Sequence, residues 1–387
     1  MSPARARPAL IRLPSGCAYP KVVPLHPTHP LSDDRTANSS LVRALRGDRP
    51  ERTPVWFMRQ AGRSLPEYHA LRAGGDMLQA CLTPELASEI TLQPVRRHGV
   101  DAGIFFSDIV VPVLLAGVDV RIVSGRGPVI DSPIRSAADV LALRPLEPDA
   151  LDPVREAVRL TVEQLGTTPL IGFAGAPFTL AAYLVEGGPS KDQMRARAMM
   201  HADPHAWAGL MNWCADITGE FLRAQVESGA SAAQLFDSWI GSVSREDYVR
   251  RVAPHSKRAL DHLRGFDVPR IHFGLGTAPI LREIAGLGVE AVGIDWRTPL
   301  DEASAVFDHA MVLQGNIDPA LLTAPWPALA AHTERVLDAG RRAPAHVANL
   351  GHGVPPDTDP DVLSRLVRLV HGEEPARLGT GAEDRAA

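Results

Sequence analysis

The sequence predicts a single (β/α)8 TIM barrel, in which a closed parallel sheet is surrounded by helices. Two observations favour this class. Eight short apolar runs of strand length recur along the chain, and they are almost continuously apolar, as strands buried on both faces should be. Stretches with helical spacing lie between these runs. Eight strands that alternate with helices are typical of this barrel.

The strand candidates begin with "PVWFM" at 54–58, which is followed at once by two arginines. In chain order, the eight candidates are 54–58, 102–107, 169–174, 232–237, 270–275, 291–296, 311–317 and 346–351.

The clearest helix covers 83–99, where Thr83 is the expected N-cap and Gly99 the expected end. A longer helix is expected over 203–229, because large apolar residues recur there every three or four positions. Two further helices with the same pattern are expected over 278–288 and 359–372.

A doubly wound open sheet is the main alternative architecture. For nucleotide binding it needs a glycine-rich turn early in the chain. The nearest match is "GLGTAP" at 274–279, which comes late and lacks the third glycine. No GK[ST] triplet occurs, so the sequence has no Walker-type phosphate loop.

Composition excludes several other classes. The net charge of −5 gives no general basic field for nucleic acid. Cys17, Cys81 and Cys214 are far apart, which argues against a disulfide framework or structural zinc and favours a reducing, cytoplasmic location. No apolar run approaches the roughly 18 residues that would span a membrane.

The two ends of the chain have a different composition. Residues 1–38 begin with a basic, proline-rich stretch that is poor in serine, unlike an organelle transit peptide, and we predict a disordered extension or an overextended start site. Residues 373–387 are expected to form a disordered tail. Residues 39–372 are then one catalytic barrel domain.

In a barrel, functional side chains lie at the carboxyl ends of the strands. Arg59 and Arg63 follow the first strand candidate, and Asp108 follows the second. A segment expected to be a loop, 175–188, contains Tyr183. The other polar residues in or after the strand candidates are Ser238, His272, Asp295, Arg297, Asn316, Asp318 and His352.

Several motifs resemble those of the uroporphyrinogen decarboxylase family. The two longest are "PVWFMRQAGRSLPEY" at 54–68 and "IGFAGAPFTLAAYLVEGG" at 171–188. Shorter matches, in the same order as in the family, are "FFSDIVVP", "LFDSWIG", "QGNIDP" and "NLGHGV". The resemblance covers roughly residues 40–372. The visible departure is Ser64, where the family often has an aromatic residue.

The resemblance implies an enzyme of haem biosynthesis that forms a homodimer and uses neither cofactor nor metal. Its substrate would be uroporphyrinogen, a flexible tetrapyrrole with four acetate and four propionate side chains. Its reaction would remove CO2 from each acetate and leave coproporphyrinogen. No nucleic acid or membrane partner is implied.

The resemblance also assigns roles to individual residues. The matching aspartate, Asp108, would lie at the centre of the macrocycle and accept hydrogen bonds from pyrrole N–H groups. Decarboxylation needs an electron sink, and a protonated pyrrole ring supplies a cation that a carboxylate stabilises. We therefore expect the catalytic residues to be Asp108, Arg59, Tyr183 and His352. The expected substrate-binding residues are Arg59, Gln60, Arg63, Asp108, Tyr183, Ser238 and His352.

Three other functions are weighed against this one. Corrinoid or thiol methyltransferases share the barrel but need a His-x-Cys zinc site, and Gly274 stands where the cysteine after His272 would be. A metal-dependent hydrolase would want an HxH pair, which does not occur. A non-catalytic tetrapyrrole-binding protein remains an alternative that CO2 release would exclude.

Overall fold

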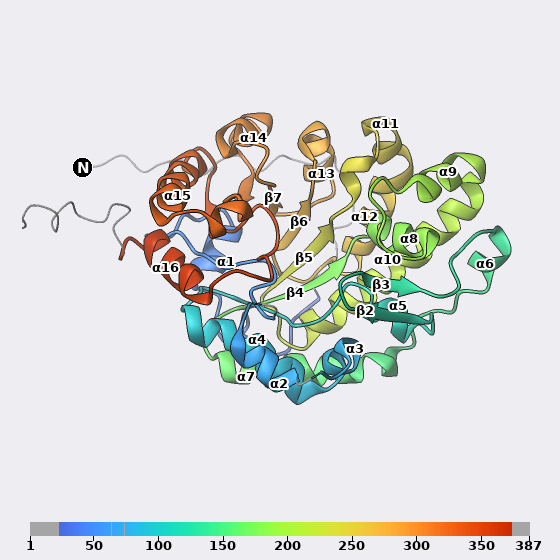
Figure 1. The fold of residues 1–387 in the computed structure, drawn as a ribbon, viewed down its shortest axis with the longest axis horizontal. Coiled ribbons are helices and arrows are strands. Elements are labelled where there is room, and N and C mark those ends of the chain that lie inside the picture. The colour runs from blue at the N-terminus through green and yellow to red at the C-terminus, as the bar shows by residue number, and fades with distance from the viewer. Residues whose placement is uncertain (1–22, 63, 73, 374–387) are drawn as a thin grey trace, which may run out of the picture.

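The computed structural model describes residues 23–62, 64–72 and 74–373. Its centre is a curled parallel sheet with the strand order β1-β4-β5-β6-β7-β8-β9, enclosed by helices (Figure 1). This arrangement confirms the predicted α/β barrel class. The strands of this sheet are β1 (Gly103–Ile104), β4 (Leu170–Gly175), β5 (Ala232–Asp237), β6 (Arg270–Gly274), β7 (Ala291–Gly293), β8 (Val312–Gln314) and β9 (His346–Val347).

The first strand candidate, 54–58, has only a few ladder contacts in the gap between β9 and β1. Val55 forms a parallel bridge with Ala348, whose backbone N–H donates to the carbonyl of Pro54 (2.8 Å). On the other side, the N–H of Asp101 donates to the carbonyl of Val55 (2.8 Å). The eighth position of the barrel is therefore filled by an irregular segment rather than a regular strand.

The helices agree with the sequence pattern where it was strongest. Helix α4 runs from Pro84 to His98 and ends at Gly99 in a left-handed conformation (φ 67°), and α10 spans Pro204–Glu227. The expected 278–288 helix is shorter, because a 3-10 turn precedes α13. The α-helices are α1 (Ser40–Leu45), α2 (Pro66–Arg72), α3 (Met77–Cys81), α4, α5 (Val111–Leu115), α6 (Ala137–Leu141), α7 (Asp152–Leu165), α8 (Pro177–Glu186), α9 (Met194–Ala202), α10, α11 (Arg245–Asp247), α12 (Ala253–Asp261), α13 (Leu281–Ala285), α14 (Leu300–Val306), α15 (Trp326–Gly340) and α16 (Pro360–Val370).

Two elements near the carboxyl ends of the strands differ from the prediction. The segment expected as a loop over 175–188 contains helix α8, which begins at Pro177, a residue whose ring suits the first turn of a helix. An antiparallel hairpin of β2 (Val120–Val123) and β3 (Gly127–Ile130) was not predicted. It lies beside α8 in Figure 1.

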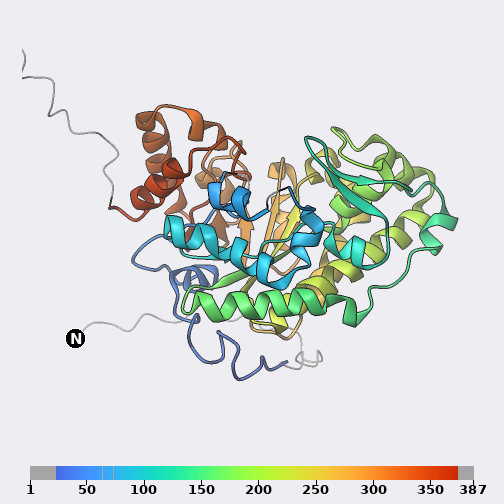
Figure 2. The same ribbon diagram turned by 60° about the horizontal axis from the view of Figure 1, so that its bottom comes forward.

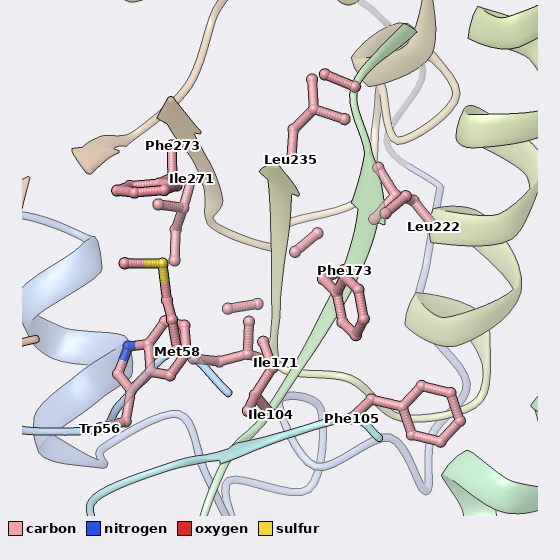
Figure 3. Close-up of a cluster of buried hydrophobic side chains, with 14 of the residues drawn as sticks. Trp56, Met58, Ile104, Phe105, Ile171, Phe173, Leu222, Leu235, Ile271 and Phe273 are labelled. Carbon is pink, nitrogen blue, oxygen red and sulfur yellow. The ribbon is translucent and has the colours of Figure 1, made fainter. Parts of the chain in front are cut away.

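One contiguous apolar cluster fills the space inside the sheet and between the sheet and its helices. Figure 3 shows part of it, with Met58 extending toward Ile271 and Leu222 entering from α10. Inside the barrel, the indole N–H of Trp56 donates to Gln314 Oε1 (3.0 Å), and Gln314 Nε2 donates to Gln234 Oε1 (2.9 Å). This short polar chain ties segment 54–58 to β8 and β5.

Residues 23–38 fall inside the predicted disordered extension, yet the structure places them against the barrel. His29 is buried and its Nε2 lies 3.0 Å from the carbonyl oxygen of Val226, while the hydroxyls of Thr36 and Ser231 are 2.8 Å apart. The segment passes below α7 in the view of Figure 2. The packed part of the chain therefore begins before residue 39. Residues 1–22 and 374–387 lie outside the described residues.

None of the described helices is long and apolar enough to cross a membrane.

Two buried histidines should make the fold sensitive to acid. Burial lowers the pKa of His98, between α4 and α16, and that of His346, on β9, to about 4. Because the unfolded chain titrates near 6.5, it binds these protons first as pH falls, so stability is lost between about pH 6.5 and 4. Titration of each histidine lowers the free energy of unfolding by about 2 kcal/mol when the pH falls from 7.5 to 5.

His98→Gln should reduce that pH-dependent loss, because glutamine does not titrate and retains a hydrogen-bonding group for Ser364, which lies 2.7 Å from His98 Nδ1. The measurement is urea unfolding of wild type and variant at pH 7.5 and 5, followed by tryptophan fluorescence. If the free energy of unfolding falls as much between pH 7.5 and pH 5 in the variant as in the wild type, His98 does not contribute to the acid sensitivity.

Candidate active site

A cavity of about 530 Å³ opens at the carboxyl ends of the strands. Five of the residues predicted from the sequence line it together. They come from the turn after segment 54–58, the β1–β4 connection, α8, the end of β5 and the segment after β9. These five residues are Arg59, Asp108, Tyr183, Ser238 and His352.

The inner wall of the cavity is aromatic. Phe173 on β4, Phe236 on β5 and Phe273 on β6 contact one another edge to face, with ring centroids 5.4 and 5.9 Å apart. Polar and charged groups are contributed mainly by the loops above these strands. The cavity therefore suits a ligand with an apolar body and polar substituents.

Arg59 lies in a tight turn directly after segment 54–58. Its φ of 63° is left-handed, which a non-glycine residue adopts only at a cost, and Gly62 (φ 123°) turns the chain again. A Cβ atom added at Gly353 would lie 2.5 Å from Cδ of Arg59. The side chain of Arg59 therefore passes directly over Gly353, and only glycine leaves room for it.

A buried asparagine fixes the two segments that meet here. Asn349 Oδ1 accepts from the N–H of Met58 (3.0 Å) and from the N–H of Leu350 (2.8 Å). The N–H of Val354 in turn donates to the carbonyl of Met58 (2.8 Å). These bonds hold the turn that carries Arg59 against the segment that carries His352.

Asp108 is half-buried at the cavity wall beyond β1. Its Oδ1 accepts a hydrogen bond from the N–H of Val110 (3.0 Å), and its own carbonyl accepts from Val111 (3.1 Å). This local turn fixes the backbone at Asp108. The carboxylate thus has a structural function for the loop and also borders the cavity.

Tyr183 projects from α8, and its ring stacks on Trp239 at a centroid distance of 3.9 Å. Burial, and after it the negative charge of Asp108, raise the pKa of this phenol to about 12, while the positive charge of Arg59 opposes the shift. At neutral pH the hydroxyl is therefore protonated and able to donate a hydrogen bond. The electrostatic coupling also places the three groups in one small region.

The end of β5 is held by a buried carboxylate. Asp237 is fully buried and accepts from the hydroxyl of Thr179 on α8 (2.8 Å). It therefore orients its neighbours rather than facing a ligand. Ser238 and Trp239, which follow it, line the cavity.

His352 is half-buried after β9, between two glycines. Its ring contacts Trp296 edge to face, at a centroid distance of 6.4 Å. This contact orients the imidazole at the cavity wall.

Gln60 was expected to contact the ligand, and the structure gives it a different function. It is fully buried, its Oε1 accepts from the N–H of Phe57 (2.9 Å), and its Nε2 donates to the carbonyl of Ala102 (2.9 Å). Its amide thus joins the first segment to the chain leading into β1. Arg63 lies outside the described residues.

The ends of β7 and β8 do not line the cavity, although polar residues follow both strands. Asp295 accepts from the N–H of Gly276 (2.6 Å) and from the guanidinium of Arg297 (2.7 Å). Asn316 donates to the carbonyls of Asp295 (2.8 Å) and Thr298 (2.6 Å). These residues stabilise one another's loops.

Several residues that line the cavity were not predicted from the sequence. Arg126 and Lys191 line the cavity from the β2–β3 hairpin and from the loop after α8, and Tyr68 and Met77 line it from α2 and α3. The glycines on both sides of Arg126 were a signal of a tight turn. Nothing in the sequence indicated that this turn reaches the cavity.

Within residues 23–62, 64–72 and 74–373, no group of three or more His, Cys, Asp or Glu side chains is arranged to hold a metal ion. Burial raises the pKa of both described cysteines, Cys81 and Cys214, which disfavours the thiolate form.

Comparison with known proteins finds relatives that match most of the chain. The family model "Uroporphyrinogen decarboxylase (URO-D)" matches residues 36–373. A uroporphyrinogen decarboxylase of Arthrobacter sp. is 64% identical over 89% of this chain and 99% of its own length. A uroporphyrinogen decarboxylase of Leifsonia xyli is 60% identical over 91% of this chain and 99% of its own length. Among solved structures, a methyltransferase from Methanosarcina mazei has the same fold (TM-score 0.72, 19% identity, 87% of this chain and 98% of that chain).

Proposed function

The chain belongs to the uroporphyrinogen decarboxylase family, and on that premise we propose that the cavity around Asp108 holds uroporphyrinogen III while its acetates lose CO2. The activity is that of a carboxy-lyase. One observation carries the assignment of the site: Arg59, Asp108, Tyr183, Ser238 and His352 converge on a single cavity with an aromatic inner wall.

The chemistry begins with a proton added to a pyrrole carbon next to the acetate-bearing position. The ring then carries a positive charge and accepts the electron pair released when the C–CO2 bond breaks. A second proton on the exocyclic carbon completes the methyl group, and the ring carbon then releases the proton that it gained first. The neutral aromatic pyrrole is thereby restored, so the net change is the replacement of CO2 by one proton. Because the ring is its own electron sink, the reaction needs no cofactor.

Asp108 stabilises the cationic ring. Its carboxylate borders a cavity lined by Phe173 and Phe236, where the low dielectric strengthens its interaction with a developing positive charge. Pyrrole N–H groups are donors that a carboxylate accepts well. Tyr183, protonated at neutral pH, donates to a substrate carboxylate or to Asp108.

Arg59 binds and orients the reacting acetate, together with Arg63. A guanidinium matches a carboxylate with two parallel hydrogen bonds. The fixed turn at Arg59 and its passage over Gly353 support a precise orientation for this group. Ser238 and His352 donate to propionates.

Gly274 favours this function over the zinc-dependent methyltransferase alternative. A Cβ atom there would lie 2.7 Å from Cγ2 of Thr277 and 3.0 Å from the carbonyl oxygen of Asp237. A cysteine would therefore not fit beside His272, which is itself completely buried. The likeness to the Methanosarcina methyltransferase concerns the fold.

Four further features belong to the same proposal. Residues 39–372 act as one catalytic domain, the enzyme works as a homodimer, and it is cytoplasmic and supplies coproporphyrinogen III for haem formation. The homodimer is tested by the mass of the purified protein measured by light scattering, where a monomer mass would contradict it.

The activity itself is tested by anaerobic incubation of purified protein with freshly reduced uroporphyrinogen III, without added metal or cofactor. We expect successive products with seven, six, five and four carboxylates, separated after oxidation to porphyrins. Substrate that binds without losing carboxylates would instead support a tetrapyrrole-binding protein.

A further inference from the structure

Two cations at the rim of the cavity belong to none of the motifs that identify the family. Arg126 lies at the tip of the β2–β3 hairpin, in a turn closed by a hydrogen bond from its own N–H to the carbonyl of Val123 (3.0 Å). Lys191 follows α8 by five residues. Both residues are exposed and both line the cavity.

The hairpin and the loop after α8 are interlocked, so the two cations belong to one structural unit. The N–H of Ile130 donates to the carbonyl of Gly187 (3.1 Å). A Cβ atom at Gly188 would lie 3.4 Å from the carbonyl oxygen of Pro128 and 3.7 Å from Nη2 of Arg126. The guanidinium of Arg126 therefore lies close above Gly188, three residues before Lys191.

In the part of the chain that the structure describes, no carboxylate lies within 4 Å of the Arg126 guanidinium or the Lys191 ammonium group. Arg121, on the same hairpin, provides a contrast, because it is paired with Asp131 at 2.8 Å. The rim thus presents two available positive charges beside a cavity that binds an anion.

The proposed substrate needs more cations than the site motifs supply. Eight carboxylates surround its ring, whereas Arg59 and His352 approach from the segments after 54–58 and after β9. Arg126 and Lys191 come from the β1–β4 and β4–β5 connections. They therefore reach a different edge of a bound macrocycle.

Building on the proposed function, we propose that Arg126 and Lys191 bind the carboxylates at this edge and select tetrapyrroles with many carboxylates. The ring must turn to present each acetate in succession, so this edge meets acetates as well as propionates. Each acetate lost removes a negative charge near the rim and weakens binding. The pair thereby favours uroporphyrinogen over the four-carboxylate product and assists product release.

The test compares wild type with the double variant Arg126→Gln, Lys191→Met. We expect KM for uroporphyrinogen to rise more than tenfold while kcat falls less than threefold, because the pair contacts no reacting atom. Raising ionic strength should increase KM of the wild type more than that of the double variant, since salt screens exposed charges. Arg121→Gln is the matched control and should leave KM unchanged.

Binding of oxidised porphyrins gives a readout independent of turnover. Fluorescence titration with uroporphyrin and coproporphyrin should show that the wild type binds the eight-carboxylate ligand more tightly. In the double variant, the ratio of the two affinities should be at least tenfold smaller. Equal loss of affinity for both porphyrins, or an unchanged KM, would overturn the inference while the decarboxylase remains. A wild type that releases no CO2 would overturn the proposed function itself.

Discussion

Replacing Asp108 with asparagine is expected to lower kcat by a factor on the order of 10²–10³, the range seen when one preorganised electrostatic group is removed from an active site. Asparagine preserves the shape of the side chain and its oxygen acceptor. The hydrogen bond from Val110 to Oδ1 (3.0 Å) is therefore retained, and the loop keeps its turn. The substitution removes the negative charge that we propose stabilises the cationic ring.

Asp359→Asn is the matched control for this substitution. Asp359 also accepts from the N–H two residues ahead (2.9 Å), but it caps α16 and does not line the cavity. The measurement is single-turnover decarboxylation of uroporphyrinogen at saturating enzyme, together with the melting temperature of each variant. An Asp108→Asn enzyme that turns over like the wild type would refute the role of the carboxylate.

Gly353→Ala should lower kcat/KM at least tenfold, although position 353 contributes no functional group. The new Cβ would lie 2.5 Å from Cδ and 2.8 Å from Cγ of Arg59, so the arginine side chain must move. A shift of about 1 Å in a group that orients the reacting bond lowers the reaction rate strongly. The fold should survive, because the clash involves a side chain and not the backbone.

A double-mutant cycle separates this mechanism from a general loss of structure. If Gly353 acts through Arg59, adding Gly353→Ala to an Arg59→Ala enzyme should lower kcat/KM little further. The effects of the two substitutions on kcat/KM are then not additive. Gly286→Ala, at the end of α13 and remote from the cavity, should have wild-type activity. Additive losses in the cycle would mean that Gly353 acts by another route.

Much of the fold could be predicted because its strands are buried on both faces. The runs at 169–174, 232–237 and 270–275 became β4, β5 and β6 almost residue for residue, since such strands must be apolar throughout. The hairpin of β2 and β3 was not predicted because its strands are partly exposed and therefore need not be apolar throughout. Helix α8 was missed because the glycines around it indicate a loop.

The sequence by itself determined the barrel class, the family, and the convergence of Arg59, Asp108, Tyr183, Ser238 and His352 on one face. The physical reason is that parallel strands bring their carboxyl ends to a common edge, so position in the chain predicts position in space. The tertiary structure decided which of the other polar side chains face the cavity. It turned the amide of Gln60 toward backbone groups, because buried donors and acceptors must be satisfied. It also brought Arg126 and Lys191 to the rim through packing between distant segments, which no local pattern encodes.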